Sequence, residues 1–415
     1  MSSASSSSAR LSSRSAASPG PPWVAIIGGG IGGLTTALAL LSNGIPCRVF
    51  EQASDFAEEG AGIQLSPNAT RLLRRLGFEG RLRQIAVRPD SLEILDGASG
   101  RRIFRVPLGD ACEARFGAPL CTMRRHALHR ALREATAPGT VVTGSRLTSL
   151  EMAGERVGLS FDEGAAYEAD VVVGADGLRS TVRGLLDDRP PVSSGKAVFR
   201  GVVAAAAGPA PLPSPSIRVW TGPDKHCIAY PVTGDGTVSF TAVVPSGDGG
   251  GDAAGSTRGL EELLGAYGGW HRDVMDLFRA SRTRRRWELY DRPPIATWVS
   301  NRVALLGDAA HPMLPFLAQG ANAAIEDAFI LAGCLAESWP DEIRDSLHRY
   351  QALRVPRASR LQAEARARAG ERPRPAGQRS PAPASGSYLD RQEWIFAYDA
   401  EGALPGPGVA LLGSG

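Results

Sequence analysis

"WVAIIGGGIGGLTTALALLSNGIPCRVFEQ", residues 23–52, decides the fold class. The apolar run at residues 24–27 predicts a strand, the spacing after the glycines predicts a helix, and residues 47–50 predict a second strand. Together they form one βαβ unit. Gly28, Gly30 and Gly33 fit G-x-G-x-x-G, in which the first glycine makes the turn, the second admits a pyrophosphate, and the third lets helix and strand pack closely.

The order of these features predicts a dinucleotide cofactor. A pyrophosphate at the glycines would lie at the positive amino end of the helix. Glu51, about 20 residues further on at the tip of the second strand, is placed to accept hydrogen bonds from the hydroxyls of an adenosine ribose. A glycine pattern alone would be weak evidence, but here strand, glycines, helix, strand and acid follow one another.

Composition limits the remaining possibilities. A chain of 415 residues, 43% of them hydrophobic, is long enough for two or three cores. A net charge of +3, without a basic stripe interleaved with aromatics, argues against a nucleic-acid partner. Five scattered cysteines with no close C-x-x-C pair predict no disulfide framework and no metal site. No apolar run reaches the roughly 18–20 residues of a membrane span, so we expect a soluble, cytoplasmic protein.

The first 21 residues are expected to lie outside the fold. They are rich in Ser and Ala, contain two arginines and lack acids. This composition is typical of a disordered tail, and a mitochondrial targeting segment is the alternative.

Two later stretches repeat the sequence of strand, glycine and acid. They are "ADVVVGADGLRSTVRGLL", residues 169–186, and "NRVALLGDAAHPMLPFLAQGANAAIEDAFILAGCLA", residues 301–336. A nicotinamide dehydrogenase would instead continue with alternating strands and helices. After Glu51, however, this chain has a Gly-rich loop and a helix, "EEGAGIQLSPNATRLLRRLGF".

Four ordered motifs carry a resemblance: GGGIGG with Glu51, MRRHALHRAL, GADGLRSTVR and LLGDAAHPMLPFLAQGAN. Over about residues 22–360 the chain resembles the single-component (group A) FAD-dependent aromatic hydroxylases, which include salicylate, 3-hydroxybenzoate and 6-hydroxynicotinate monooxygenases. The resemblance implies an α/β fold. It comprises a Rossmann-like FAD-binding domain of the glutathione-reductase type, a smaller mixed-sheet substrate domain, and a C-terminal helical region.

The expected boundaries follow the motifs. Residues 22–190 and 286–360 are assigned to the FAD-binding domain, 191–285 mainly to the substrate domain, and 361–415 to a partly disordered C-terminal region. About residues 369–388, Pro, Gly, Ser and Arg are too dense for a packed helix. The following "RQEWIFAYDAE" matches the ending of the relatives. A natural insertion and an imperfect gene model would each explain the difference.

The resemblance also assigns cofactor contacts. It implies that Asp308 binds the ribityl chain, that Asp176 and Gly177 lie near the pyrophosphate, and that Arg125 reaches toward the flavin. Arg124 stands where the relatives have a histidine before that arginine.

Further contacts are expected along the flavin ring. Gly62 corresponds to the loop that lies along the flavin. A helix starting near Gly320 would point its positive amino end at the pyrimidine side and stabilise negative charge on reduced flavin. Gly320, Ala321 and Asn322 are then the closest backbone positions. An ordinary helix start after a proline loop is the alternative.

The implied activity is a monooxygenation. NADH or NADPH reduces bound FAD, O2 gives a flavin hydroperoxide, and a small phenolic or heteroaromatic acid is hydroxylated. A base that accepts the phenolic proton speeds oxygen transfer, and a water-poor pocket protects the intermediate. Two alternatives stay open: a tailoring oxygenase of the same fold (epoxidase or Baeyer-Villiger-like) acting on a secondary metabolite, and a flavin-binding protein without activity. Either a monomer or a homodimer is compatible with the sequence.

Candidate substrate residues come from two stretches. His226 and Tyr230 are four residues apart in a predicted strand, so both lie on one face. A His-x-x-x-Tyr pair lines the pocket of hydroxybenzoate and hydroxynicotinate hydroxylases, which implies that His226 is the base and Tyr230 a pocket residue; a surface histidine is the alternative. Arg200 would bind a substrate carboxylate or be an ion-paired strand residue. Gln319 would orient the substrate hydroxyl or satisfy the loop, and His311 is expected to shape the loop.

Overall fold

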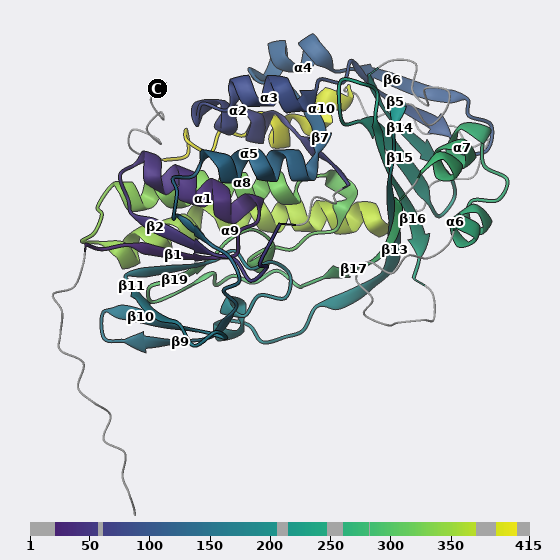
Figure 1. Cartoon of the computed structure of the whole chain (residues 1–415). Coiled ribbons are helices and arrows are strands. Elements are labelled where there is room, and N and C mark those ends of the chain that lie inside the picture. The colour runs from purple at the N-terminus through teal and green to yellow at the C-terminus, as the bar shows by residue number, and fades with distance from the viewer. Residues whose placement is uncertain are drawn as a thin grey trace, which may run out of the picture.

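The computed structural model describes residues 21–56, 61–205, 215–246, 260–281, 283–370 and 387–404. It shows a large α/β domain beside a smaller sheet domain, with the last helix near their junction (Figure 1). The predicted tail at residues 1–20 lies outside the described residues, as do positions 371–386 of the insertion.

A six-stranded sheet forms the centre of the large domain. Its order is β18 (Val299–Ser300), β19 (Val303–Leu305), β12 (Val171–Gly174), β1 (Val24–Ile27), β2 (Cys47–Phe50) and β8 (Val141–Val142). All neighbours are parallel except β18 and β19. The strands expected at 24–27, 47–50 and 171–173 are confirmed. Parallel neighbours drawn from distant parts of the chain place their carboxyl ends at one edge of the sheet.

Helices cover one face of this sheet and a small sheet covers the other (Figure 1). On the helical face, α1 packs against both α5 and α8, and α8 packs against α9. Their bounds are α1 (Ile31–Ser42), α5 (Arg125–Ala135), α8 (Gly320–Ala336) and α9 (Ile343–Gly370). The opposite face carries β9 (Leu147–Ala153), β10 (Arg156–Phe161) and β11 (Ala166–Ala169). Because α1 and α8 are buried along nearly their whole length, their apolar composition extends around the helix.

The glycine turn fixes how α1 meets the sheet. Gly28 has a φ of 107°, and a Cβ there would lie 2.4 Å from the Ala175 carbonyl oxygen. A Cβ on Gly33 would lie 2.0 Å from the carbonyl oxygen of Gly28. Position 28 therefore requires glycine because of its left-handed backbone conformation and because the residue after β12 leaves no space for a side chain. Position 33 requires glycine because the helix touches the backbone of the turn there.

The smaller domain is a mixed seven-stranded sheet. Its order is β17 (Thr283–Asp291), β13 (Val192–Val203), β16 (Val238–Pro245), β15 (His226–Pro231), β14 (Ser216–Thr221), β5 (Ser91–Asp96) and β6 (Arg102–Pro107). Strands β14 and β5 are parallel and the others antiparallel. Residues 191–285 supply most of this sheet, but β5 and β6 come from an earlier part of the chain. The exposed edge strand β6 gave no alternating pattern that would have marked its place.

Short elements connect the two domains. Strands β3 (Gly62–Leu65), β7 (Cys121–Arg124) and β4 (Ala86–Val87) form a sheet whose members contact β15 and β16. Around it lie α2 (Pro67–Arg75), α3 (Glu79–Ile85), α4 (Gly109–Phe116) and α10 (Tyr388–Phe396). Two further helices, α6 (Leu260–Ala266) and α7 (Arg272–Ala280), cover the outer face of the seven-stranded sheet. Among the described residues, no helix has the length and apolarity to cross a membrane.

The contact at Gly33 predicts a stability effect. A Gly33→Ala substitution should lower the free energy of unfolding by about 1–3 kcal/mol, because the new methyl group would overlap a backbone oxygen that cannot turn away. Denaturant unfolding of the apoprotein measures this. Gly80→Ala in α3 is the matched control, since a Cβ there meets nothing within 4 Å. Equal stability of the Gly33→Ala and wild-type proteins would contradict the proposed packing.

Candidate active site

Acidic residues follow three strands at the carboxyl edge of the central sheet. Glu51 follows β2, Asp176 follows β12, and Asp308 follows β19. In the order β19-β12-β1-β2, Glu51 and Asp308 are separated by three strand spacings, roughly 14 Å. An extended ligand lying across this edge would contact both acids.

The glycine turn after β1 is held on both sides. The Gly29 N–H donates to Glu51 Oε2 at 2.8 Å, and the Ala53 N–H donates to Oε1 at 2.9 Å. On the other side, His129 Nε2 lies 2.6 Å from the Gly29 carbonyl oxygen. Burial lowers the pKa of His129, and a carbonyl only accepts, so the neutral ring donates from Nε2. The turn is thus fixed before any ligand binds.

The amino end of α1 leaves room for a phosphate. A Cβ on Gly30, the N-cap residue, would meet nothing within 4 Å. In the described structure no side chain caps this helix, and its first turn carries no acid. Free N–H groups at an uncovered helix start are suited to an anion, so this site fits the pyrophosphate of a dinucleotide.

Asp176 shapes the turn after β12. Its carboxylate accepts hydrogen bonds from Ser180 Oγ and from the N–H groups of Thr181 and Val182. Burial raises the pKa of this carboxyl despite these bonds. Gly177, with a φ of 78°, follows in open space. Contact of these two residues with a cofactor stays a prediction.

Asp308 follows β19 at the carboxyl edge of the central sheet. Its side chain is exposed to solvent, and the surrounding protein raises the pKa of its carboxyl. A Cβ on Gly320 would lie 3.8 Å from Asp308 Oδ1, which places this acid beside the start of α8. Behind it, Asp327 Oδ2 accepts from the Gly307 N–H and contacts His311 Nε2. His311 is buried in this contact, which supports its expected role in shaping the loop.

The amino end of α8 is tied to its neighbours by Asn322. Asn322 Oδ1 accepts from the Ser66 N–H at 2.9 Å, and Nδ2 donates to the carbonyls of Gln64 and Ala318. Ala318 has a φ of 53°, a left-handed conformation that is strained for alanine. The helix itself begins at Gly320 without a capping side chain or an acid in its first turn. Its partial positive charge therefore remains available to a ligand.

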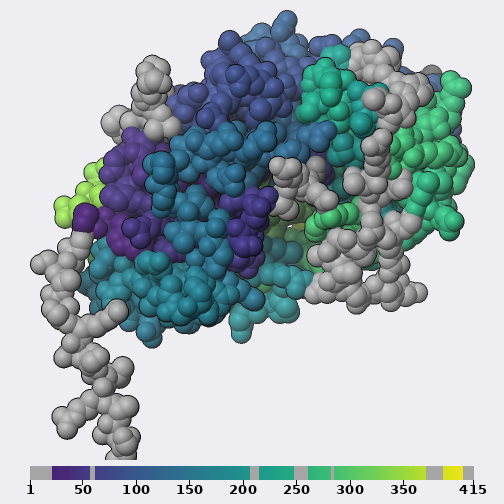
Figure 2. Space-filling model, viewed as in Figure 1, coloured from purple at the N-terminus to yellow at the C-terminus, as the bar shows by residue number. Residues whose placement is uncertain are grey.

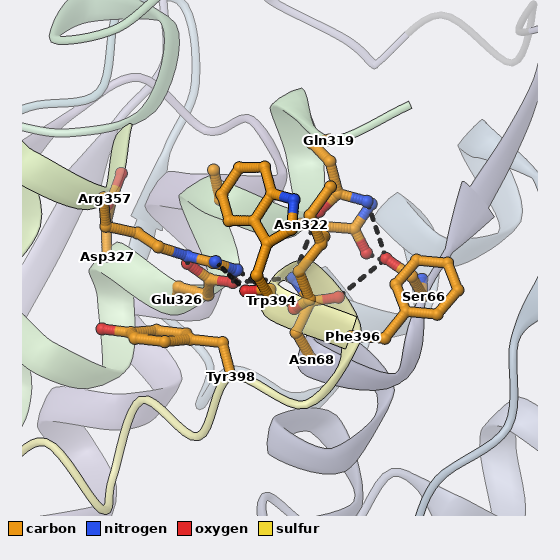
Figure 3. Close-up of polar contacts among 12 residues, drawn as sticks. Ser66, Asn68, Gln319, Asn322, Glu326, Asp327, Arg357, Trp394, Phe396 and Tyr398 are labelled. Atoms are coloured by element: carbon orange, nitrogen blue, oxygen red, sulfur yellow. Dashed lines mark hydrogen bonds and ion pairs between the residues drawn. The ribbon is translucent and has the colours of Figure 1, made fainter. Parts of the chain in front are cut away.

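Gln319 is turned inward. Its Nε2 donates to Ser66 Oγ at 2.8 Å, and its Oε1 accepts from Asn68 Nδ2 at 3.2 Å (Figure 3). The side chain is 2% exposed. Of the two interpretations offered by the sequence, this geometry supports the one in which Gln319 satisfies the loop.

Gly62 lies at a close contact between β3 and the seven-stranded sheet. Its N–H donates to Ser239 Oγ at 2.8 Å. A Cβ on Gly62 would lie 2.5 Å from a ring carbon of Tyr230 and 2.7 Å from Val232. Only glycine allows β3 to approach the seven-stranded sheet this closely. The surface of the molecule is hollowed between the two domains (Figure 2).

The inner face of the seven-stranded sheet carries the predicted substrate residues. Cys227 and Ala229 pack into the outer cluster beneath α6 and α7. The alternate residues His226, Ile228 and Tyr230 therefore lie on the inner face, as predicted. The ring of His226 makes an edge contact with Phe316 of the loop before α8, with 5.6 Å between centroids.

Arg200 lies on the same face. It pairs with Thr241, which in turn pairs with Ile228, so the three form a row across β13, β16 and β15. No hydrogen bond or ion pair joins the Arg200 side chain to another residue in the described part of the chain. Burial lowers the pKa of its guanidinium, and the charge of Arg125 adds to that effect.

Burial on the inner face, modified by nearby positive charge, sets the protonation of His226 and Tyr230. Burial, followed by the charge of Lys196, lowers the pKa of His226 to about 4. Burial raises the pKa of Tyr230 to about 12, against the opposing effects of Arg200 and a hydrogen bond with Gln64. At neutral pH the site thus offers a neutral imidazole and a protonated phenol.

The two arginines at the start of α5 differ in position. The Arg125 N–H donates to the Ala61 carbonyl next to Gly62, and its charge also acts on Asp308. Arg124 pairs with Gly62 in the ladder between β3 and β7, and its charge acts on Asp235. Arg124 is therefore directed in part toward the smaller domain.

The sequence pattern of a family described as FAD binding domain matches residues 23–365. The chain belongs to this family. A 3-amino-4-hydroxybenzoate 2-monooxygenase of Streptomyces platensis is 40% identical over 91% of this chain and 96% of its own length. A 6-hydroxynicotinate 3-monooxygenase of Pseudomonas fluorescens is 36% identical over 82% of this chain and 89% of its own. The predicted family and enzyme class, an FAD-dependent aromatic monooxygenase, are confirmed.

Solved structures confirm the fold predicted for this chain. Klebsiella pneumoniae HpxO in complex with FAD and uric acid matches with a TM-score of 0.77 and 29% identity, covering 84% of this chain and 88% of that one. A salicylate hydroxylase substrate complex matches with a TM-score of 0.76 and 25% identity, covering 92% and 97%. FAD is thus the cofactor that the carboxyl edge has to accommodate. Gly30, Glu51 and Asp308 fit it, because Gly30 leaves free space at the start of α1 and the two carboxylates can accept hydrogen bonds from hydroxyl groups.

Three polar residues at the site were not predicted from the sequence. His129 lies four residues after Arg125, hence on the same helix face, which is a signal that was available. Gln64 lies two residues after Gly62 in one strand and so shares its face. Ser239 is brought to Gly62 only by strand pairing across the domain interface, and no local pattern marks it.

Gly30 provides a test of the phosphate site. A Gly30→Ala substitution should weaken FAD binding at least about tenfold, because the methyl group would occupy the space over the helix start, while leaving the stability of the apoprotein unchanged. Titration of apoprotein with FAD, followed by flavin fluorescence, measures the affinity. Undiminished FAD affinity in this variant would place the pyrophosphate elsewhere.

Proposed function

We propose that this monooxygenase hydroxylates a benzoate-type acid whose ring carries a hydroxyl or amino group, the class that includes 3-amino-4-hydroxybenzoate. Three aminohydroxybenzoate monooxygenases share 40% identity with the chain, against 34–37% for the hydroxynicotinate and hydroxybenzoate enzymes. The structural observation that carries the proposal is the position of Arg200 on the inner face of the sheet.

Arg200 is partly buried, and a partly buried cation is stabilised by an anionic partner. Burial costs Arg200 part of its hydration, and no described carboxylate offsets that cost. A substrate carboxylate would accept two parallel hydrogen bonds from the planar guanidinium. The neighbouring Thr241 and Ile228 then provide a surface that changes from polar to apolar along the ring of the substrate.

His226 is proposed as the proton acceptor for the ring hydroxyl. Its pKa of about 4 keeps the imidazole neutral, so it has a free lone pair for the phenolic proton. Positive charge that disfavours the imidazolium opposes full transfer of the proton to His226, whereas the same charge stabilises a phenolate and so favours loss of the proton from the substrate. Bound FAD, reduced by NAD(P)H, supplies the activated oxygen. The residues of the chain orient the ring, take the proton and exclude water.

The charge of the inner face bears on the alternative functions. A tailoring oxygenase acting on a neutral polyketide or terpenoid would leave Arg200 without a counter-ion, so the geometry favours an acid. The cytoplasmic location, the oligomeric state and the choice between NADH and NADPH stay predictions.

The function is tested by a panel of hydroxy- and aminohydroxybenzoates and hydroxynicotinates, each with an analogue that lacks the carboxylate. We expect a ring acid to stimulate NAD(P)H oxidation by FAD-loaded protein and to give a product that has gained one oxygen. Arg200→Met should raise KM for the acid at least about tenfold, through loss of a charge-assisted pair. KM for the analogue should not change.

The outcome is decisive in both parts. No stimulation by any member of the panel would refute the proposed function. Equal loss of affinity for the acid and its analogue in Arg200→Met would show that Arg200 supports the sheet rather than the carboxylate.

His226 predicts an unusual pH dependence. Because its pKa is lowered from 6.5 to about 4, kcat/KM should show no loss from His226 protonation between about pH 7 and 5. His226→Gln should lower kcat by about 10²- to 10⁴-fold. Steady-state rates across pH measure both. An acid limb near pH 6.5 that disappears in His226→Gln would contradict the burial of this imidazole.

A further inference from the structure

The C-terminal segment, residues 387–404, begins with a helix that lies near the junction of the two domains (Figure 1). Its helix α10 starts at a capping box formed by Ser387 and Asp390. From this segment, Leu389, Ile395 and Phe396 are buried in the same apolar cluster as Tyr230 and Ile217 of the inner face. Met313, Leu317 and Ile228 lie at the partly exposed margin of this cluster. The segment therefore adjoins the proposed substrate chamber.

One guanidinium joins this segment to the helix that begins at the flavin site. Arg357 of α9 donates from Nε and Nη2 to Glu326 of α8, at 3.2 and 2.9 Å. It also donates from Nη1 to the Trp394 carbonyl at 2.6 Å and from Nη2 to the Ile395 carbonyl at 3.1 Å. The ring of Tyr398 stacks against it at 4.1 Å (Figure 3). The last carbonyls of α10 thus find their donors outside the helix.

A second arginine holds the same segment from another element. Arg71 of α2 donates to the carbonyls of Tyr398 at 3.0 Å and Phe396 at 3.5 Å, and also to the carbonyl of Phe116. Burial lowers the pKa of Arg71, so its charge is partly shielded from solvent. Docking therefore depends on directed bonds to main-chain oxygens in addition to apolar contact.

Glu326 links this docking to the start of α8. It is fully buried and accepts from Asn68 Nδ2 at 2.6 Å, and Asn68 in turn donates to Gln319. A continuous set of hydrogen bonds therefore runs from the Trp394 carbonyl through Arg357, Glu326 and Asn68 to the N-cap of α8 (Figure 3).

We propose that Arg357 is a positioning residue that holds the C-terminal segment as a wall of the substrate chamber, and that this wall keeps water from the oxygen-transfer step. The proposal rests on the function proposed above. In productive turnover, substrate, O2, NAD(P)H and H⁺ give hydroxylated product, NAD(P)⁺ and H2O. When water enters, NAD(P)H, H⁺ and O2 give NAD(P)⁺ and H2O2, and the substrate is released unchanged.

An Arg357→Lys substitution tests whether Arg357 acts through its hydrogen bonds to the C-terminal segment or only through its positive charge. A lysine would keep a positive charge near Glu326, which also retains Arg354 at 2.8 Å. A compact ammonium on a flexible stem cannot contact one carboxylate and two carbonyls in this geometry. Arg349→Lys is the matched control, because Arg349 lies on the same helix and pairs with Glu337 rather than with the C-terminal segment.

The experiment compares Arg357→Lys, Arg349→Lys and wild type as FAD-loaded enzymes. In Arg357→Lys we expect the fraction of NAD(P)H recovered as hydroxylated product to fall at least about twofold, with a matching rise in H2O2 and a higher substrate KM. FAD affinity should be unchanged. In the apoprotein, amide hydrogen exchange in residues 387–404 should be at least about tenfold faster. Arg349→Lys should behave as wild type in every measurement.

Two results would overturn the proposal: coupling and KM in Arg357→Lys equal to wild type, or faster exchange without any loss of coupling, which would make the segment merely structural. If Arg357→Lys does not fold, Arg71→Lys is used instead, because it removes donors to the carbonyls of the C-terminal segment without changing the contacts of Glu326. Unchanged coupling and KM, or faster exchange without loss of coupling, would again overturn the proposed role of the segment. A wild-type enzyme that no ring acid stimulates would instead refute the proposed function, while the exchange measurement would still report on docking.

Discussion

Arg354 lies fully buried between Glu326 and Asp327 of α8, and much of the site depends on this arrangement. Burial alone would lower the pKa of the guanidinium, but the two carboxylates outweigh it and raise that pKa. Burial likewise opposes ionisation of Asp327, and His311 with Arg354 overcomes it, so the pKa of this carboxyl falls to about 2. Removing one member would leave an uncompensated charge in the core, which is costly. Each carboxylate also makes a second contact, since Asp327 holds the Gly307 N–H beside Asp308, and Glu326 holds Asn68 and Arg357.

These second contacts connect the cofactor edge with the substrate chamber through one rigid helix. At its amino end, α8 fixes the strained Ala318 turn and the loop after β3 through Asn322. Along its length, it carries the carboxylates that position the Gly307 turn and α9. The two domains then meet at Gly62, where the absence of a side chain permits contact with Tyr230. The loop after β3 is thus held by Asn322 of α8, and the strand before it packs directly on the seven-stranded sheet.

The features that could be predicted from the sequence are those that depend on a local pattern of residues. The strands at 24–27 and 47–50, the glycine turn and the acids at strand ends were all readable, because parallel strands bring their carboxyl ends to one edge. The inner-face position of His226 and Tyr230 followed from strand alternation. The Arg354 ion network could not be read in this way, since nothing in "YQALRVPRASR" distinguishes a buried arginine from an exposed one. The pairing of β5 with β14 and the bond from Ser239 to Gly62 depend on contacts between distant segments, which leave no periodic signal.

The distribution of charge explains how one cavity can hold two different partners. The acids Glu51 and Asp308 follow strands at the carboxyl edge of the central sheet, where they could accept hydrogen bonds from ribose and ribityl hydroxyls, and the uncapped start of α1 offers backbone N–H groups to the phosphates. The cations Arg200, Lys196 and Arg125 lie toward the substrate side, where an acid and a phenolate need counter-charge. Burial, followed by the charge of Lys196, keeps His226 neutral, so the imidazole retains its lone pair. An imidazolium there would be poorly solvated, would add a further positive charge and would be unable to take a proton. The cations that would attract a substrate anion therefore act together with burial to keep the proposed base unprotonated.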